Sequence, residues 1–402
     1  MFDHHGAPAD AGGPASGGSD APEDVLRPSL GSSAKSVDRR RVQKRRQRVA
    51  AALLPDERVS SCLWSMAARA TGVTVLLRDK RARFNGLQTC GSVWVCPVCS
   101  QRVAEARRKE LNAALVWARG SGFVPVMLTL TARHGLTDCL QRLLGRLKDA
   151  KRALRQSRSW RALKGVLRGT ITASEVTHGR AGFHPHFHEL LFVQAESEAE
   201  AVLLIETLRA EWVRCLDRFE LNGNGHAFRV QGAAEAGRYI AKFGAAEQVH
   251  LADCAKPGGS WGAAEELTLS ARKSGQGLHP FELLDRAAKG DRRSRAAFVE
   301  YAAAFRGRRQ LVWSPGLKGS VALDEVSDDT IAKGSEDQLD LIVGIIEPDL
   351  WWRSRYLKDG RSLILEAAEN HCLADFLESL RRMLGSGLEG PSSVPGRMEA
   401  NA

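Results

Sequence analysis

Long apolar runs are missing from this 402-residue sequence. No stretch approaches the roughly 20 consecutive apolar residues that a membrane-spanning helix needs, and the N-terminus has no apolar segment of the signal-peptide type. Cysteine is also sparse, because eight residues spread along the chain do not make a disulfide scaffold. We therefore expect no membrane partner and no disulfide-rich secreted fold, and we predict a cytoplasmic protein in a reducing compartment.

Basic residues outnumber acidic ones, and they are unevenly placed. The sequence has 58 Lys and Arg against 47 Asp and Glu, which gives a formal net charge of +11. Residues 101–168 hold sixteen basic and four acidic side chains, whereas residues 321–350 hold nine acids and one Lys. A basic surface in the first half of the chain favours nucleic acid as the partner, without distinguishing DNA from RNA.

The N-terminal segment has the composition of a disordered tail. Residues 1–34 hold six Gly, four Pro and almost no large apolar side chains, so they bury too little surface to offset the entropy of ordering. Residues 35–48 then place eight basic side chains around Asp38. This run is interpreted either as a solvated, frayed helix or as an arm that follows a phosphate backbone.

Three segments have the pattern of β-strands, at 124–131, 169–177 and 184–193, and the last two predict a hairpin about residues 178–183. Five leucines between Leu140 and Leu154 fall on one helical stripe, with arginines projecting elsewhere. Helical patterns between and after the strands favour an α+β domain over a βαβ repeat.

Half of the cysteines are clustered. Cys96 and Cys99 form a CxxC unit, with Cys90 and Cys62 preceding it. Four thiolates close a tetrahedral zinc site and leave no open position, so this Zn²⁺ would be structural. A redox CxxC pair or unrelated buried cysteines are the alternatives, but the thioredoxin-like βαβ context of a redox pair is missing. Cys62, the furthest from the CxxC unit in the sequence, is the fourth candidate ligand.

A second candidate metal site lies on the strand at 184–193. His184, His186 and His188 alternate and therefore leave one face of this strand. Two imidazoles can bind a divalent cation and still leave positions open for a phosphate. Glu175, roughly opposite on the partner strand of the hairpin, is the best third ligand; the alternative is an ordinary surface Glu.

Tyrosine is scarce, with three residues in the whole chain. Tyr239 lies in a helical pattern with Glu235 four residues before it and Lys242 three residues after it, so these side chains lie on neighbouring turns. A core tyrosine beside a surface Glu is the ordinary explanation of this pattern. Beside a metal-binding strand and a basic surface, it favours phosphodiester transfer through a phosphotyrosine.

Taken in order, these motifs resemble those of the rolling-circle plasmid replication initiators of the HUH endonuclease superfamily, in the single-tyrosine class. The resemblance runs from about Cys62 to Leu317 and depends on five segments: CGSVWVCPVC at 90–99, LTLTARH at 128–134, EVT at 175–177 with HPHFH at 184–188, RYIAKF at 238–243 and QLVWSPGL at 310–317. Phe243 stands where many members have a second Tyr, a mild departure because the first Tyr is the nucleophile of the pattern.

The resemblance implies a fold and a chemistry. The fold is an HUH-type antiparallel sheet flanked by helices, preceded by a small Cys-rich zinc-binding region and followed by a mainly helical C-terminal region. His186 and His188 would be the metal pair for Mg²⁺ or Mn²⁺, with Glu175 as a further ligand and His184 as an auxiliary or orienting residue. Tyr239 would nick a plasmid origin and keep a 5′-phosphotyrosine, Lys242 would add positive charge, and Glu235 would permit hydrolytic termination.

Four regions and a set of partners follow from this interpretation. We expect a disordered tail with a basic arm at 1–48, the Cys-rich zinc-binding region at 49–120, the HUH nicking-joining domain at 121–250 and a C-terminal region at 251–402 that binds DNA or a partner. The partners implied are double- and single-stranded origin DNA and the host replicative helicase and polymerase, with room for a homo-oligomer at the origin. The alternatives are an HUH transposase or relaxase, and a non-catalytic zinc-containing DNA-binding regulator.

Overall fold

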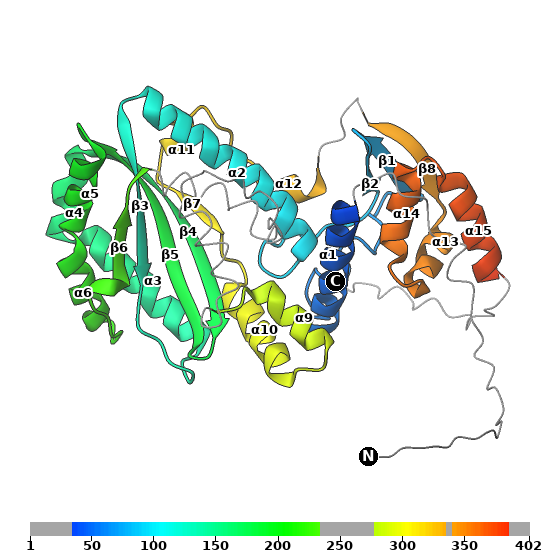
Figure 1. Ribbon diagram of the computed structural model, residues 1–402, viewed down its shortest axis with the longest axis horizontal. Coiled ribbons are helices and arrows are strands. Elements are labelled where there is room, and N and C mark those ends of the chain that lie inside the picture. Colours follow the sequence, from blue (N-terminus) through cyan, green and yellow to red (C-terminus); the bar gives the residue numbers. More distant parts are fainter. Residues whose placement is uncertain (1–33, 234–276, 335–339, 386–402) are drawn as a thin grey trace, which may run out of the picture.

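The predicted hairpin forms the middle of a five-stranded antiparallel sheet. The computed structural model describes residues 34–233, 277–334 and 340–385 (Figure 1). The strand order of this sheet is β6-β3-β5-β4-β7, so the histidine-bearing strand β5 is the central one. Its strands are β3 (Phe123–Thr131), β4 (Leu167–Gly179), β5 (Gly182–Gln194), β6 (Phe228–Gln231) and β7 (Leu311–Trp313).

The β4–β5 hairpin has a tight connection that fixes its register. Residues 180–181 join the two strands, and Gly182 adopts a φ of +85°. A Cβ at this position would also lie 2.9 Å from the carbonyl oxygen of Gly135, so glycine meets both a conformational and a steric requirement. The resulting register places Glu175 directly opposite His186.

The two faces of the large sheet are covered by different helices. One face packs on α3 (Leu140–Gln156), α5 (Glu198–Glu206) and α6 (Arg209–Arg218), and the predicted leucine stripe of α3 is buried there and in the adjoining core. The other face packs on α2 (Pro97–Gly120) through Met127, Leu190 and Phe192. Because side chains alternate along a strand, His186 and His188 lie on the α2 face. Short elements complete this part: α4 (Arg158–Ala162), η2 (Leu163–Gly165), η3 (Gly225–Ala227), α11 (Leu317–Ser320) and α12 (Asp328–Lys333).

A second, three-stranded sheet joins segments that are far apart in the sequence. Its order is β2-β1-β8, formed by β1 (Val73–Arg78), β2 (Arg81–Asn85) and β8 (Leu341–Ile346). The following elements pack against it around a core that includes Trp351: α13 (Pro348–Arg353), η4 (Ser354–Tyr356), α14 (Gly360–Glu369) and α15 (Leu373–Gly385). The last described segment therefore shares one sheet with residues just before the cysteine motif.

The helix α1 (Ala34–Leu53) lies between the two sheets, where it also contacts α9 (Pro280–Ala288), which in turn packs on α10 (Arg292–Phe305) (Figure 1). Its arginines form ion pairs across the structure: Arg40 with Glu369, Arg41 with Glu366, Arg45 with Asp359 and Arg46 with Asp285. The run at 35–48 is thus neither a frayed helix nor a free arm in this structure. Carboxylates from distant helices neutralise much of its charge, which the local sequence could not reveal.

The expected α+β architecture is confirmed, with antiparallel sheets flanked by helices, a four-cysteine cluster ahead of the large sheet and a mainly helical C-terminal segment. The proposed region boundaries at 48, 120 and 250 remain predictions. None of the described helices has the length and apolar character needed to cross a membrane.

Candidate metal centres

Glu175, His186 and His188 come together on the α2 face of the large sheet. Glu175 comes from β4 and the two histidines from β5. The Nε2 atoms of His186 and His188 each lie 3.4 Å from Oε2 of Glu175. Two alternating positions on one strand and one position on its neighbour thus direct one carboxylate and two imidazoles to a single point.

Hydrogen bonds on the other ring nitrogens orient the two imidazoles. Nδ1 of His186 lies 3.2 Å from the carbonyl oxygen of His184, and a carbonyl can only accept, so this nitrogen carries the proton. Nδ1 of His188 lies 3.0 Å from Oγ1 of Thr129 on β3. Both Nε2 atoms are therefore presented to Glu175, in the arrangement by which metal-binding histidines are usually held.

The carboxylate of Glu175 is suited to bind a cation. Burial by itself would raise its pKa, but the charges of His188 and His186 and the hydrogen bonds from both rings hold that pKa well below its usual range. Its side chain keeps 38% exposure, whereas each histidine keeps 13%. The group is anionic at neutral pH and open on one side.

These three ligand atoms are placed to hold a divalent cation. All lie within 4.8 Å of one another. Neighbouring ligands at the 2.0–2.1 Å bond length of octahedral Mg²⁺ lie about 3 Å apart. The observed 3.4 Å separations are close to this value. The choice of Mg²⁺ or Mn²⁺ remains a prediction.

His184 lies beside this group but outside it. Its Nδ1 is 3.1 Å from Nδ1 of His134, and its Nε2 is 3.4 Å from Oγ1 of Thr131. Burial, followed by the charges of His186, His134 and His188, lowers the pKa of His184 to about 3, so the ring is neutral. These contacts agree with the auxiliary role that we expected for His184, which remains a prediction.

Thr129 and His134 were not predicted as individual site residues, although both lie in the LTLTARH segment at 128–134. The alternation of Thr129 and Thr131 in this segment indicates that both side chains leave the same face of a strand. What the sequence could not give is the register of β3 against β5, which places Thr129 opposite His188.

Tyr239, Glu235 and Lys242 lie outside the described residues, so their predicted roles remain predictions. The first described range ends at residue 233, just after β6, and the next begins at residue 277. This strand pairs with β3, the neighbour of the histidine strand.

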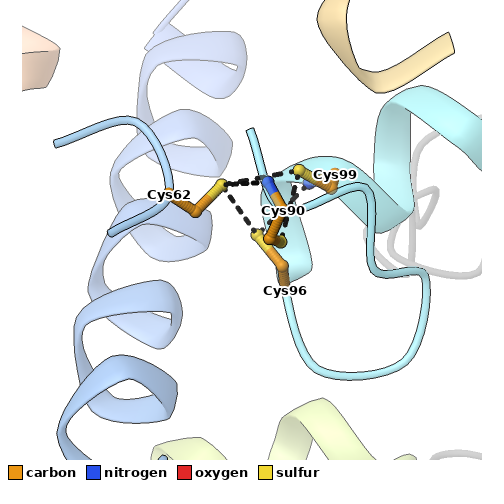
Figure 2. Close-up of side chains that lie close together, drawn as sticks. All are labelled: Cys62, Cys90, Cys96 and Cys99. Carbon is orange, nitrogen blue, oxygen red and sulfur yellow. Dashed lines mark hydrogen bonds between the residues drawn. The ribbon is translucent and has the colours of Figure 1, made fainter. Parts of the chain in front are cut away.

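The four predicted cysteines form a second cluster, shown in Figure 2. Cys62 follows α1, Cys90 follows β2, and Cys96 and Cys99 begin α2. The Sγ atoms of Cys62 and Cys96 are 3.7 Å apart, those of Cys62 and Cys99 are 3.5 Å apart, and those of Cys90 and Cys99 are 3.7 Å apart. A tetrahedron with Zn–S bonds of about 2.3 Å has edges of about 3.8 Å. The thiols thus fit a zinc ion.

Local structure explains how the CxxC unit is directed to one point. Cys96 is the N-cap of α2, its sulfur accepts a hydrogen bond from the backbone N–H of Cys99, and Pro97 occupies the first turn. Hydrogen bonds from the other three cysteines lower the pKa of Cys99, which favours its thiolate. Cys96 and Cys99 are fully buried. This burial disfavours the redox alternative, because reactive CxxC pairs are partly exposed.

The basic residues between 102 and 168 divide into two groups. Several are paired within the protein, for example Arg107 with Asp328 and Arg155 with Glu189. Others are exposed on α3 and α4, including Arg142, Lys148 and Arg158. Because α3 covers the face opposite to Glu175, these exposed side chains do not line the metal site.

Comparison with known families identifies part of the chain. Residues 81–219 match the family model described as "Replication protein". This segment is similar to that family of replication proteins. It contains the CxxC unit, β3 and the whole β4–β5 hairpin, and therefore all three residues of the candidate divalent-cation site.

Two relatives of the whole chain can be compared with this family match. The chain is 28% identical over 340 residues to the Streptomyces lividans protein called "Protein rep". The aligned region covers 69% of this chain and 70% of the relative. It is also 30% identical over 143 residues to a protein of Streptomyces cyanogenus called "Neomycin resistance protein", over 29% of this chain and 32% of that one. No solved structure matches at a significant level. The resemblance to plasmid replication initiators is confirmed by the family match and the first relative, and the two support plasmid replication initiation.

Proposed function

We propose that this protein initiates rolling-circle replication of a plasmid by nicking one strand of the origin at a specific site. The observation that carries this proposal is the convergence of Glu175, His186 and His188 on the central strands of the segment that matches the replication-protein family. A purely DNA-binding regulator gives no reason for two oriented imidazoles and an ionised carboxylate in one open site.

In this proposal the three side chains hold a divalent cation against the scissile phosphate. When bound, the cation would polarise a non-bridging oxygen and offset the charge that develops on the phosphate. Thr129 and the carbonyl of His184 keep the imidazoles directed at the cation. The carboxylate of Glu175 is ionised near neutral pH and would supply the anionic ligand.

The proposed nucleophile is Tyr239, on the sequence argument given above. Its Oη would form a bond to phosphorus while the bond to O3′ breaks, so that the strand keeps a free 3′-OH and the protein keeps a 5′-phosphotyrosine. The phenol proton ends on the leaving oxygen, and Lys242 would add positive charge near the phosphate. Host polymerase would extend the 3′-OH behind the host helicase. Glu235 would then orient water for hydrolytic termination.

The cysteine cluster takes no part in this chemistry. Four buried sulfurs leave no position for substrate, so we propose a structural Zn²⁺ there. The exposed basic side chains of α3 and α4 are candidates for binding the DNA backbone away from the scissile phosphate. Assembly of several copies at the origin, and function in the cytoplasm, remain part of this proposal.

The decisive experiment combines purified protein with a supercoiled plasmid carrying the replicon and with the origin as single-stranded DNA. We expect a nick that depends on Mg²⁺ or Mn²⁺ and a protein-linked 5′ end. Tyr239→Phe should bind the DNA but form no adduct. Tyr356→Phe is the matched control, because Tyr356 is 69% exposed and lies in the C-terminal segment, and it should react like the parent.

The outcomes separate the candidate functions. A normal adduct yield from Tyr239→Phe would overturn the nucleophile, and DNA binding without any nicking would favour the non-catalytic regulator. Cleavage confined to transposon ends or to a transfer origin would identify a transposase or a relaxase instead.

A further inference from the structure

Arg361 is a buried cation whose binding partners are incomplete. It lies on α14, and its side chain is 1% exposed. Nη1 donates to Oε1 of Gln47 at 2.9 Å and to the carbonyl oxygen of Leu63 at 3.2 Å, and the guanidinium stacks 4.0 Å from the ring centre of Trp64. Nε and Nη2 have no hydrogen-bond partner within the described structure.

Gln47 connects this arginine to the cysteine cluster. It lies on α1 and is 1% exposed. Its Nε2 donates to Sγ of Cys96 at 3.4 Å and to the carbonyl oxygen of Cys62 at 3.1 Å, while its Oε1 accepts from Arg361. One buried amide thus touches a candidate zinc ligand at one end and the guanidinium at the other.

The nearby carboxylates are already paired with other cations. On and beside α14, Glu369 pairs with Arg40, Glu366 with Arg41 and Asp359 with Arg45. A further buried cation, Lys44, donates to the carbonyl oxygen of Arg361 at 2.8 Å and so adds positive charge to the same region. In the described part of the chain, no ion pair between Arg361 and a carboxylate is present.

A buried guanidinium without a counter-ion is strongly unfavourable, so negative charge is expected close to Arg361. Burial and the charge of Arg48 lower its pKa to about 9, and the charges of Cys62 and Cys96 oppose this shift. Four thiolates around one Zn²⁺ keep a net negative charge, whereas four neutral thiols have none. The metal-loaded cluster therefore supplies the charge that the surroundings of Arg361 lack.

We propose that Arg361 is the counter-ion of the zinc-loaded cysteine site, and that through it zinc binding is coupled to docking of the C-terminal segment (residues 340–385) on the cysteine-bearing region. The inference rests on the zinc occupancy proposed above and not on the nicking reaction. Because coupling between two equilibria is reciprocal, zinc stabilises the docked segment and the docked segment tightens zinc.

Three substitutions of Arg361 distinguish the effect of its charge from the effect of its packing. Arg361→Met and Arg361→Gln remove the charge but keep a long side chain. Arg361→Lys keeps the charge but loses the planar guanidinium and its set of N–H donors. Arg381→Met is the matched control, since Arg381 lies on the neighbouring helix α15, is 44% exposed and pairs with Glu347. Zinc affinity is measured by competition with a chromophoric chelator, and amide hydrogen exchange is followed in α14 and in β5.

We expect Arg361→Met and Arg361→Gln to weaken zinc binding about 10–100-fold, as loss of a contact that supports metal ligands typically does. Arg361→Lys should stay within a few-fold of the parent, and Arg381→Met should match it. Chelating zinc from the parent should speed amide exchange in α14 at least about tenfold and leave β5 unchanged.

Two results would overturn the inference. If all three Arg361 substitutions changed zinc affinity equally, the residue would act through packing, and if α14 exchanged at the same rate with and without zinc, the coupling would be absent. If the neutral variants fail to fold, the comparison of parent, Arg361→Lys and Arg381→Met with and without zinc still decides the coupling. Parent protein that never contains or takes up zinc would overturn zinc occupancy and this inference together, while leaving the nicking proposal intact.

Discussion

Glu175 lies directly across the hairpin from His186, and the same carboxylate oxygen is 3.4 Å from the nearest ring nitrogens of His186 and His188. Two features of the backbone produce this relationship: the pleat, which places alternate residues on one face, and the tight turn at Gly182, which sets the register. A shift of one residue would send Glu175 to the α3 face and destroy the site.

The hydrogen bond between Thr129 and His188 should support metal binding. Thr129→Val removes the hydroxyl with little change of shape, so His188 should lose its orienting partner. We expect the apparent affinity of the nicking reaction for Mg²⁺ or Mn²⁺ to fall about 10–100-fold, with activity largely recovered at saturating metal. Thr129→Ser should restore the parent affinity. Equal metal dependence of parent and Thr129→Val would contradict the role.

The two metal sites should respond differently to mutation. Cys96→Ser should lose zinc and lower the unfolding temperature, because a structural zinc site contributes directly to folding. His186→Ala should keep zinc and stability but lose nicking. Cys139→Ser is the control, because Cys139 is exposed and lies outside the cluster. Elemental analysis and thermal unfolding provide the measurements, and a stable, zinc-loaded Cys96→Ser protein would refute the assignment.

Two carboxylates that pair with cations of α3 should differ greatly in their effect on stability. Glu189 is fully buried and forms ion pairs with Arg155 at 2.8 Å and with Lys151 at 3.4 Å. Glu220, in contrast, is 76% exposed and pairs with Arg146. Glu189→Gln should cost about 3–5 kcal/mol because it leaves two partly buried cations without their buried carboxylate. Glu220→Gln should cost about 0–1 kcal/mol. Urea unfolding of both variants tests this contrast, and similar losses would contradict it.

The contact between α1 and α14 should weaken in acid. Burial raises the pKa of Asp359, but the hydrogen bond and charge of Arg45 outweigh it, so the pKa lies below its usual value. A depressed pKa contributes stability that is present above the unfolded value of about 3.9 and is lost as the pH falls through the folded value.

Asp359→Asn is the appropriate variant for this test, because Asn tolerates the φ of +56° at this position. The parent should unfold with a higher free energy than the variant at pH 6, and the difference should shrink below about pH 4. A difference that stays constant over this pH range would show that Asp359 does not act through its charge.

Glu235 is predicted to act at termination and not at initiation. Glu235→Ala should form the first adduct normally and then terminate poorly, because no group would orient water at the second cleavage. Replication products longer than one plasmid unit should accumulate and can be measured on denaturing gels. Clean unit-length products would leave Glu235 as an ordinary helix-stabilising residue that pairs with Arg238 or Lys242.

Local patterns in the sequence were sufficient for the elements that build the two metal sites. The alternation of His184, His186 and His188 predicted one face of a strand, and the leucine stripe predicted the buried side of α3. The CxxC spacing likewise predicted two sulfurs on one edge of a tetrahedron. These periodicities depend on backbone geometry over a few residues, so they can be recognised without knowledge of the rest of the fold.

Contacts between distant segments were decided only by the tertiary structure. The alternation on β3 did not reveal that Thr129 would meet His188, because strand register depends on packing of the whole sheet. The pairing of β8 with β1 and the position of Arg361 beside the cysteines join residues almost 300 positions apart. The basic run of α1 had the pattern of a DNA-binding arm, but four of its arginines pair with carboxylates on or beside α14 and on α9. The sign of each charge can be read from the sequence, whereas the residue that neutralises it depends on which distant segments the fold brings together.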